Sequence, residues 1–230
     1  MNPLRKHCNE LSDALAELIR PELDQHKRGG PFIILGSETG LQCCCDFYGL
    51  TSTKMAIWLQ AEIPHWRNGP AMVVNDALIL ADCNGCQESA ALVLNAVACH
   101  ELAHCLAFPK LCSDQEPTDA REMDFVPAII SDTKPAAQYA VDSERKSHGP
   151  GFIRIMLHVR WRMIQSGWLV PFSDLLDWER FAKHPGELVR MSLKDEFKRL
   201  QDLPLSAVQH VPAPSEFVKL FEGSTMLVES

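Results

Sequence analysis

The sequence predicts an α+β fold in which a small mixed or antiparallel sheet packs against helices. Apolar residues recur at helical spacing near the start of the chain, and a long Ala- and Leu-rich stretch without Gly or Pro lies near its middle. Between them, short β-type runs are separated by turn residues. The chain has 230 residues, 46% hydrophobic and 23% charged, a globular composition that suits one larger domain or two small ones.

The first expected element is an amphipathic helix within residues 4–27. Leu11 and Leu15 lie on one side of this helix with charged residues between them, so that side can face a core. Pro21 is expected to interrupt the helix because proline has no backbone N–H to donate. The Gly-Gly-Pro sequence that follows residue 28 is expected to end it.

Short strands are expected next. The runs that predict them are Phe32–Leu35, Gln42–Tyr48, Ala56–Ile63 and Met72–Ala81. Within the last run, Asn75-Asp76 is either a turn between two strands or a polar interruption in one longer edge strand. Leu78–Ala81 is the candidate edge strand for pairing with an extended peptide, and burial in the core is its favoured alternative.

Two helices are expected in the second half of the chain. The stretch Gln87–Phe108 predicts the longest helix, and Pro109 closes it. A second helix is expected over about Phe152–Gln165, with Pro150 near its first turn. The polar segment 110–147 between them is expected to be an insertion or lid.

These elements are expected to form one domain over residues 1–172. Residues 173–230 are expected to form a small helical extension, broken at Pro185-Gly186 and at Pro204, with a loosely held tail after Pro212.

Charge and cysteine content exclude several classes of function. The 22 basic and 30 acidic residues give a net charge of −8, which opposes attraction to phosphate backbones, so a nucleic-acid partner requires a local basic patch. No uninterrupted apolar run reaches the roughly 18 to 20 residues of a membrane-spanning helix, so no membrane partner is expected. Acidic residues interrupt any signal-peptide core near the N-terminus, and nine cysteines suit a reducing compartment, so we expect a cytoplasmic protein.

The strongest chemical motif is the H-E-x-x-H pattern formed by His100, Glu101 and His104 within the longest expected helix. Residues four apart lie on one face of an α-helix, so both imidazoles can bind the same Zn²⁺. Glu101 is rotated by about 100° from His100, so its carboxylate can act as general base on a zinc-activated water. The motif therefore predicts a catalytic zinc site.

A catalytic zinc usually takes three protein ligands and a water, so a third ligand is needed. His148 is the leading candidate, because the glycines that follow it let the backbone pass close to a metal. Glu144 is the main alternative and would make a two-histidine, one-carboxylate site. Glu122 and Asp124 are weaker alternatives.

The HELAH sequence at His100–His104 and the HGPGF sequence at His148–Phe152 together resemble the SprT-like (Spartan-like) zinc metallopeptidases. The resemblance covers roughly residues 70–165. It implies a zincin-type fold with a sheet packed on the active-site helix, a bound Zn²⁺, and hydrolysis of peptide bonds in a protein or peptide substrate. It also implies that His148 is the third ligand.

Two other functions remain open. One is a non-catalytic metal-binding or protein-binding module with a zincin-like fold, which has no need of a carboxylate at Glu101. The other is a DNA-associated protease, which requires a continuous basic surface. Arg154, Arg160 and Arg162, with Trp161, could contact nucleic acid, although a helix face paired with carboxylates is the favoured interpretation.

Several further residues have both a functional and a structural interpretation. Cys83 and Cys86 form a lone C-x-x-C, for which packing in the core is favoured over a zinc or redox role. His158 can orient a substrate but is more often an ordinary helix residue. Tyr139 is a candidate for oxyanion stabilisation on residue type alone.

Overall fold

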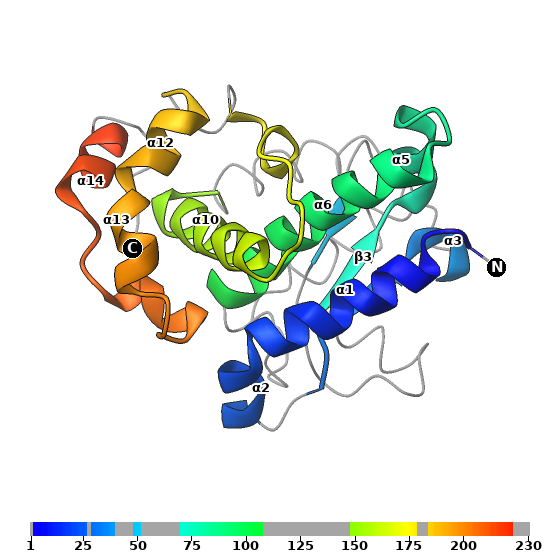
Figure 1. Cartoon of the computed structure of the whole chain (residues 1–230), viewed down its shortest axis with the longest axis horizontal. Coiled ribbons are helices and arrows are strands. Elements are labelled where there is room, and N and C mark those ends of the chain that lie inside the picture. The colour runs from blue at the N-terminus through cyan, green and yellow to red at the C-terminus, as the bar shows by residue number, and fades with distance from the viewer. Residues whose placement is uncertain are drawn as a thin grey trace, which may run out of the picture.

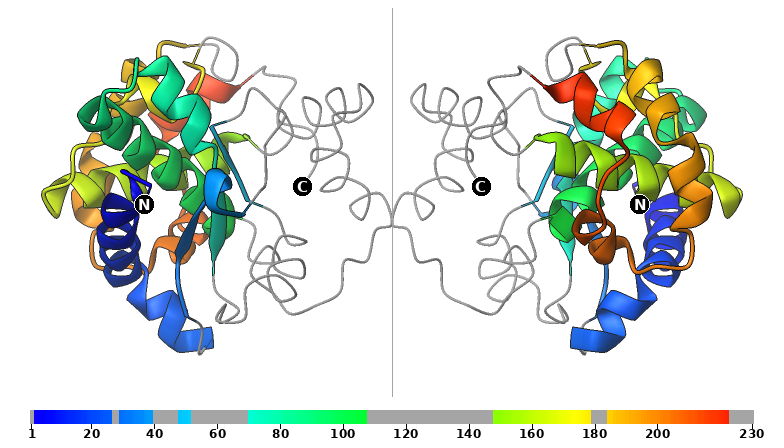
Figure 2. Two further views of the ribbon diagram at one scale, coloured as in Figure 1. Left: turned by 90° about the vertical axis from the view of Figure 1, so that its right-hand side faces the viewer. Right: turned by 90° about the vertical axis from the view of Figure 1, so that its left-hand side faces the viewer.

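The computed structural model describes residues 2–26, 29–39, 48–51, 70–107, 148–178 and 184–222. Within these residues the fold is mixed and mostly helical, with one small sheet, which confirms the predicted α+β class (Figure 1). Most of the described helices gather on one side of the strands (Figure 2).

The sheet has three strands in the order β1-β3-β2. Their bounds are β1 Phe32–Leu35, β2 Gly49–Leu50 and β3 Ala71–Val74. The β1 and β3 strands pair in parallel and β2 pairs antiparallel to β3, so the sheet is mixed, which is one of the two predicted arrangements. The strand expected at Phe32–Leu35 is confirmed, whereas Ala56–Ile63 and most of Gln42–Tyr48 lie outside the described residues.

The expectation of strand structure over the whole run Met72–Ala81 is wrong. The strand ends at Val74, and helix α5 spans Asp76–Asp82. The Asn75 side chain accepts a hydrogen bond from the backbone N–H of Leu78 at 3.2 Å and so caps the start of this helix. Leu78–Ala81 is therefore helical and cannot serve as an edge strand for a peptide.

The N-terminal helix is interrupted near Pro21, as the sequence predicted. Helix α1 spans Arg5–Leu18 and α2 spans Arg20–His26, with Pro21 in the first turn of α2. Burial of Cys8, Leu11 and Leu15 confirms the amphipathic side of α1, which packs against β1. A short helix α3, Gly36–Thr39, follows β1 directly.

The two central helices are α6, Gln87–Ala107, and α10, Pro150–Gln165. Both lie where the sequence predicted them, and they pack against each other while α6 also covers β2 and β3. By length and composition alone, α6 is apolar enough to cross a membrane. However, 72% of the apolar 18-residue stretch within this helix is buried inside the protein. That burial is what a central core helix requires.

The C-terminal segment is helical, as expected. Its elements are η2 Ser173–Leu175, α12 Gly186–Ser192, α13 Lys194–Arg199, η3 Leu205–His210 and α14 Ser215–Phe221. The α12 helix follows Pro185 directly and η3 follows Pro204. Residues on both sides of position 172 belong to one hydrophobic cluster, so this segment shares the core of the rest of the chain.

The expectation that the chain after Pro212 is loosely held is wrong for the residues up to 222. Phe217 and Phe221 of α14 are only 2% and 4% exposed and belong to the core cluster. Their spacing of four residues places both rings on one side of a short helix, which supplies the apolar face that holds it.

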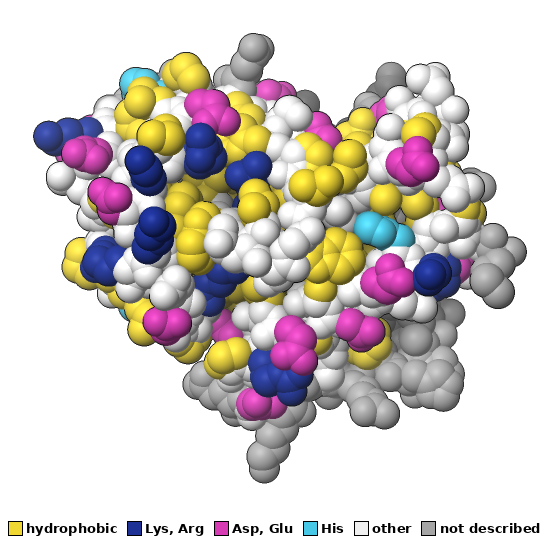
Figure 3. Space-filling model, in the orientation of Figure 1, with side chains coloured by type: hydrophobic (Ala, Val, Ile, Leu, Met, Phe, Trp, Pro, Cys, Tyr) yellow, Lys and Arg dark blue, Asp and Glu magenta, His cyan; other side chains and the backbone are white. Residues whose placement is uncertain are grey.

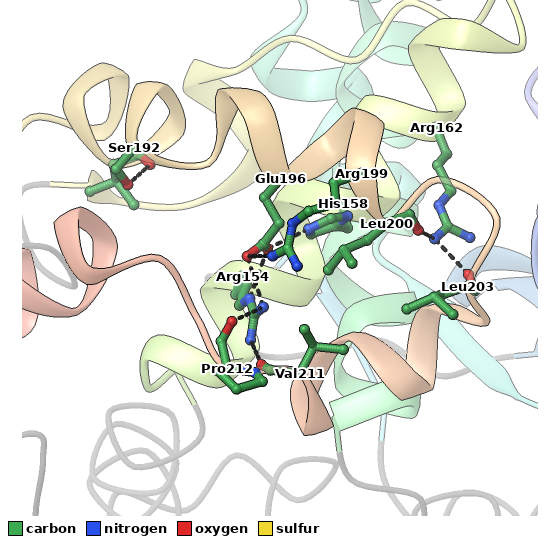
Figure 4. A network of polar contacts seen from close by, with 11 residues as sticks. Arg154, His158, Arg162, Ser192, Glu196, Arg199, Leu200, Leu203, Val211 and Pro212 are labelled. Carbon is green, nitrogen blue, oxygen red and sulfur yellow. Dashed lines mark hydrogen bonds and ion pairs between the residues drawn. The ribbon is translucent and has the colours of Figure 1, made fainter.

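A buried ionic network ties α10 to the C-terminal helices (Figure 4). The Arg154 guanidinium donates to both carboxylate oxygens of Glu196 at 2.8 Å and to the carbonyl of Val211 at 2.7 Å. His158 Nε2 lies 2.8 Å from the same carboxylate. Burial raises the pKa of Glu196, but hydrogen bonds from His158 and Arg154 outweigh it, so the pKa is lowered and the carboxylate stays ionised.

The side chains of the predicted basic and aromatic cluster make contacts within the protein. Arg162 donates to the carbonyls of Leu200 and Leu203. Arg160 donates to the Val170 carbonyl, and Trp161 stacks on the Phe197 ring. These contacts agree with the interpretation as a paired helix face, although within the described part of the chain only Arg154 of the three arginines forms an ion pair with a carboxylate.

Replacing Arg154 with Met should destabilise the protein by about 3 to 5 kcal/mol, because it leaves the buried Glu196 charge without its guanidinium partner. Urea unfolding followed by circular dichroism measures the change. The matched control is Glu187→Ala, which removes a solvent-exposed pair with Arg190 and should cost about 1 kcal/mol or less. Equal effects of the two substitutions would contradict the assigned role of the buried network.

Candidate metal centre

Two elements far apart in the chain bring three histidines together. His100 and His104 lie one turn apart on α6, and His148 immediately precedes Gly149, the N-cap of α10. Their ligand atoms lie within 4.8 Å of one another. Contact between α6 and the start of α10 therefore creates the cluster.

The three Nε2 atoms form a nearly equilateral triangle. The distances are 3.1 Å from His100 to His104, 3.1 Å from His104 to His148 and 2.9 Å from His148 to His100. Ligand nitrogens about 2.0 to 2.1 Å from a tetrahedral zinc lie about 3.3 Å from one another. The triangle is therefore close to the spacing that a shared metal ion requires, and this cluster could hold one.

The tautomer of His100 favours metal binding. Its Nδ1 lies 2.7 Å from the Leu175 carbonyl oxygen, and because a carbonyl can only accept, Nδ1 must carry the proton. The Nε2 lone pair of the neutral ring then points into the cluster. Leu175 lies in η2, so the predicted C-terminal extension orients a site residue.

The surroundings keep His100 and His104 neutral. Removal from water lowers the pKa of His100 to about 4. Burial also lowers the pKa of His104, and the neighbouring His100 and His148 lower it further. The Phe152 ring, which stacks on His104 at 4.2 Å between centroids, supplies an apolar wall. Neutral imidazoles with free lone pairs are the form that binds a metal.

Glu101 lies on the side of α6 that faces the sheet and is 6% exposed. A Cβ atom added to Gly49 of β2 would lie 3.0 Å from Glu101 Oε1 and 2.5 Å from Val97 Cγ1. Only glycine allows the strand to approach the carboxylate so closely. Gly49 is absent from the predicted site residues, although a glycine within a short strand is a known sign of such an approach.

Most other candidates lie elsewhere or outside the described part of the chain. Glu144, Glu122, Asp124, Tyr139 and the segment 110–147 all lie outside the described residues. His158 is fully buried in the Glu196 network and does not join the histidine cluster.

The described cysteines divide into two groups. Cys8 is buried, and so are Cys99 and Cys105, which flank the motif on α6, as expected of packing residues. Cys83 is half-buried and packs against the core, as predicted, whereas Cys86 is exposed, so core packing does not explain it. Among the described residues, this pair belongs to no group of three or more potential metal ligands.

Comparison with known proteins adds no relative. No protein-family model, no curated protein and no solved structure matches this chain.

Replacing His148 with Ala should remove one of the three nitrogens that could hold a metal ion and lower zinc uptake to a small fraction of the wild-type value. Inductively coupled plasma mass spectrometry after dialysis against trace zinc measures the stoichiometry. His210→Ala removes an exposed histidine and should leave the zinc content unchanged. Full zinc content in the His148 variant would instead favour Glu144 as the third ligand.

Proposed function

We propose that this chain is a zinc-dependent metallopeptidase of the SprT-like type, with a zincin-like fold. The observation that carries the proposal is the meeting of His100, His104 and His148 around a common centre, next to a carboxylate on the same helix. A structural metal site does not need Glu101 at that place, whereas peptide hydrolysis does.

Each residue has a defined task in the proposed reaction. The three imidazoles would hold the zinc, which when bound supplies Lewis-acid polarisation of the scissile carbonyl and a water of lowered pKa. Glu101 takes the proton from the attacking water and delivers it to the leaving amine. Leu175 holds His100 in the required tautomer through its carbonyl.

The fold is compatible with this proposal because the sheet packs on the helix that carries the motif. The β2 strand, at one end of the strand order, runs beside Glu101. It replaces Leu78–Ala81 as the strand along which an extended protein or peptide substrate would lie near the general base. We propose a cytoplasmic location, which suits a chain whose described cysteines form no disulfide with one another.

The other candidate functions have less support. A non-catalytic metal-binding or protein-binding module leaves the placement of Glu101 against Gly49 without a purpose. A DNA-associated protease needs a continuous basic surface. On the face in Figure 3 most Lys and Arg side chains lie on the left, but apolar side chains separate them and acidic ones lie around them. The net charge of −8 also opposes binding to a phosphate backbone.

Replacing Glu101 with Gln should leave zinc binding intact and lower peptide hydrolysis by about 10²- to 10⁴-fold, the usual contribution of a general base. The zinc-loaded protein is incubated with a peptide library digested from a whole proteome, and new termini are identified by mass spectrometry. Glu88→Gln, an exposed glutamate in the first turn of the same helix, is the matched control. A zinc-loaded wild type that cleaves no peptide, or a fully active Glu101 variant, would refute the proposal.

Replacing Gly49 with Ala should lower kcat while zinc content stays unchanged, because the added methyl group would clash with Val97 and crowd Glu101, and so displace the carboxylate or move β2. Gly151→Ala is the control, since a Cβ there meets nothing within 4 Å. Steady-state kinetics on one peptide identified from the library measures the effect. Wild-type kcat in the Gly49 variant would show that this close approach does not position the carboxylate.

A further inference from the structure

The turn between α5 and α6 carries two cysteines that the proposed hydrolysis does not use. Cys83 is the C-cap of α5, and Cys86 accepts a hydrogen bond from the Ala90 N–H through its carbonyl at 3.0 Å, at the start of α6. Cys86 is exposed and Cys83 is half-buried. Small molecules in solution can therefore reach Cys86, and Cys83 is less enclosed than the buried Cys99 and Cys105.

The backbone of this turn brings the two cysteines close together. The Cys86 N–H donates to the Cys83 carbonyl at 2.9 Å, and the central residues Asn84 and Gly85 have φ values of 52° and 75°. Positive φ at both central positions is the pattern of a type I′ turn, whose first and fourth Cα atoms lie less than about 7 Å apart. A disulfide needs a Cα separation of about 4.4 to 6.8 Å, so the turn can accept one with little backbone movement.

The two sulfurs have different environments. The Ser89 hydroxyl donates to Cys86 Sγ at 3.3 Å, and this hydrogen bond, with those from the backbone N–H groups of Ser89 and Glu88, lowers the pKa of Cys86. Partial burial raises the pKa of Cys83, with a further contribution from the negative charges of Cys86, Asp82 and Asp174. Cys86 is accordingly the more nucleophilic thiol at neutral pH and Cys83 the thiol that stays protonated.

We propose that Cys83 and Cys86 form a reversible dithiol–disulfide site that reacts with hydroperoxides. The Cys86 thiolate attacks the terminal peroxide oxygen, the O–O bond breaks, and an alcohol, or water from hydrogen peroxide, leaves after taking up a proton. Cys86 then carries a sulfenic acid. Cys83 sulfur attacks the Cys86 sulfur, the S–O bond breaks, water leaves with the thiol proton, and the S–S bond forms.

The electrons balance within this sequence. The two sulfurs lose two electrons in total, and the peroxide gains them. A small thiol reductant returns the pair to the starting state by thiol–disulfide exchange. The site is independent of the histidine cluster, so the absence of peptide hydrolysis would not bear on it.

The test uses the full-length, zinc-loaded protein and hydrogen peroxide near equimolar concentration. Free thiols are then blocked by alkylation, and cleavage after Glu62 and Glu88 releases a peptide whose only cysteines are Cys83 and Cys86. We expect this peptide to escape alkylation and to be lighter by two hydrogen atoms. Treatment with dithiothreitol before alkylation should restore two alkylated cysteines.

Three variants assign the roles of the residues. Cys83→Ser should leave a sulfenic acid on Cys86 that dimedone traps, and Cys86→Ser should abolish the fast reaction with peroxide. Ser89→Ala should slow the reaction several-fold at neutral pH, because the thiolate loses a hydrogen bond. The rise of the reaction rate with pH should then occur at a higher pH. Gln87→Ala, at an exposed position that keeps both that hydrogen bond and the Glu88 cleavage site, should not slow the reaction.

Two results would overturn the proposal. One is full alkylation of both cysteines after peroxide treatment under conditions that oxidise free glutathione. The other is a disulfide that joins Cys86 to a different peptide of the chain, which would show that Cys83 is not its partner.

Discussion

The packing of α6 against the start of α10 is the constraint on which the rest of the structure depends. The motif on α6 supplies two imidazoles, and the third arrives only because α10 begins beside it. The Cys99 thiol lies 3.6 Å from the Met156 carbonyl across this contact, and Phe152 packs against all three histidine rings. A shift of this contact by one helical turn would separate His148 from its partners by about 5 Å.

The C-terminal helices hold this contact in place. Glu196 of α13 binds Arg154 and His158 of α10 in the interior, which fixes the rotation of α10 about its axis. Leu175 of η2 accepts the hydrogen bond that sets the tautomer of His100. The segment that begins at residue 173 therefore supports the site from two directions, and its apolar side chains continue the same core.

The other side of α6 depends on the sheet. Gly49 lets β2 lie against Glu101 without a side chain between them. Tyr48, the residue before this strand, donates to Asp82 at the end of α5 at 2.5 Å, and that hydrogen bond raises the pKa of Tyr48 to about 12. Its backbone carbonyl also accepts from the Asn75 N–H. The two contacts connect the residue before β2 to both ends of α5. They therefore help to hold β2 in position beside Glu101.

Local sequence alone determined the helices that carry the motif, the first strand and the break at Pro21, because propensity, capping and proline effects act within about one helical turn. It failed at Leu78–Ala81, since a short apolar run suits a strand or a helix and the Asn75 cap decides between them. Only the tertiary structure could place Gly49 beside Glu101 and Leu175 beside His100. His100 and Leu175 are 75 residues apart, and such contacts depend on how whole helices pack, which no local pattern contains.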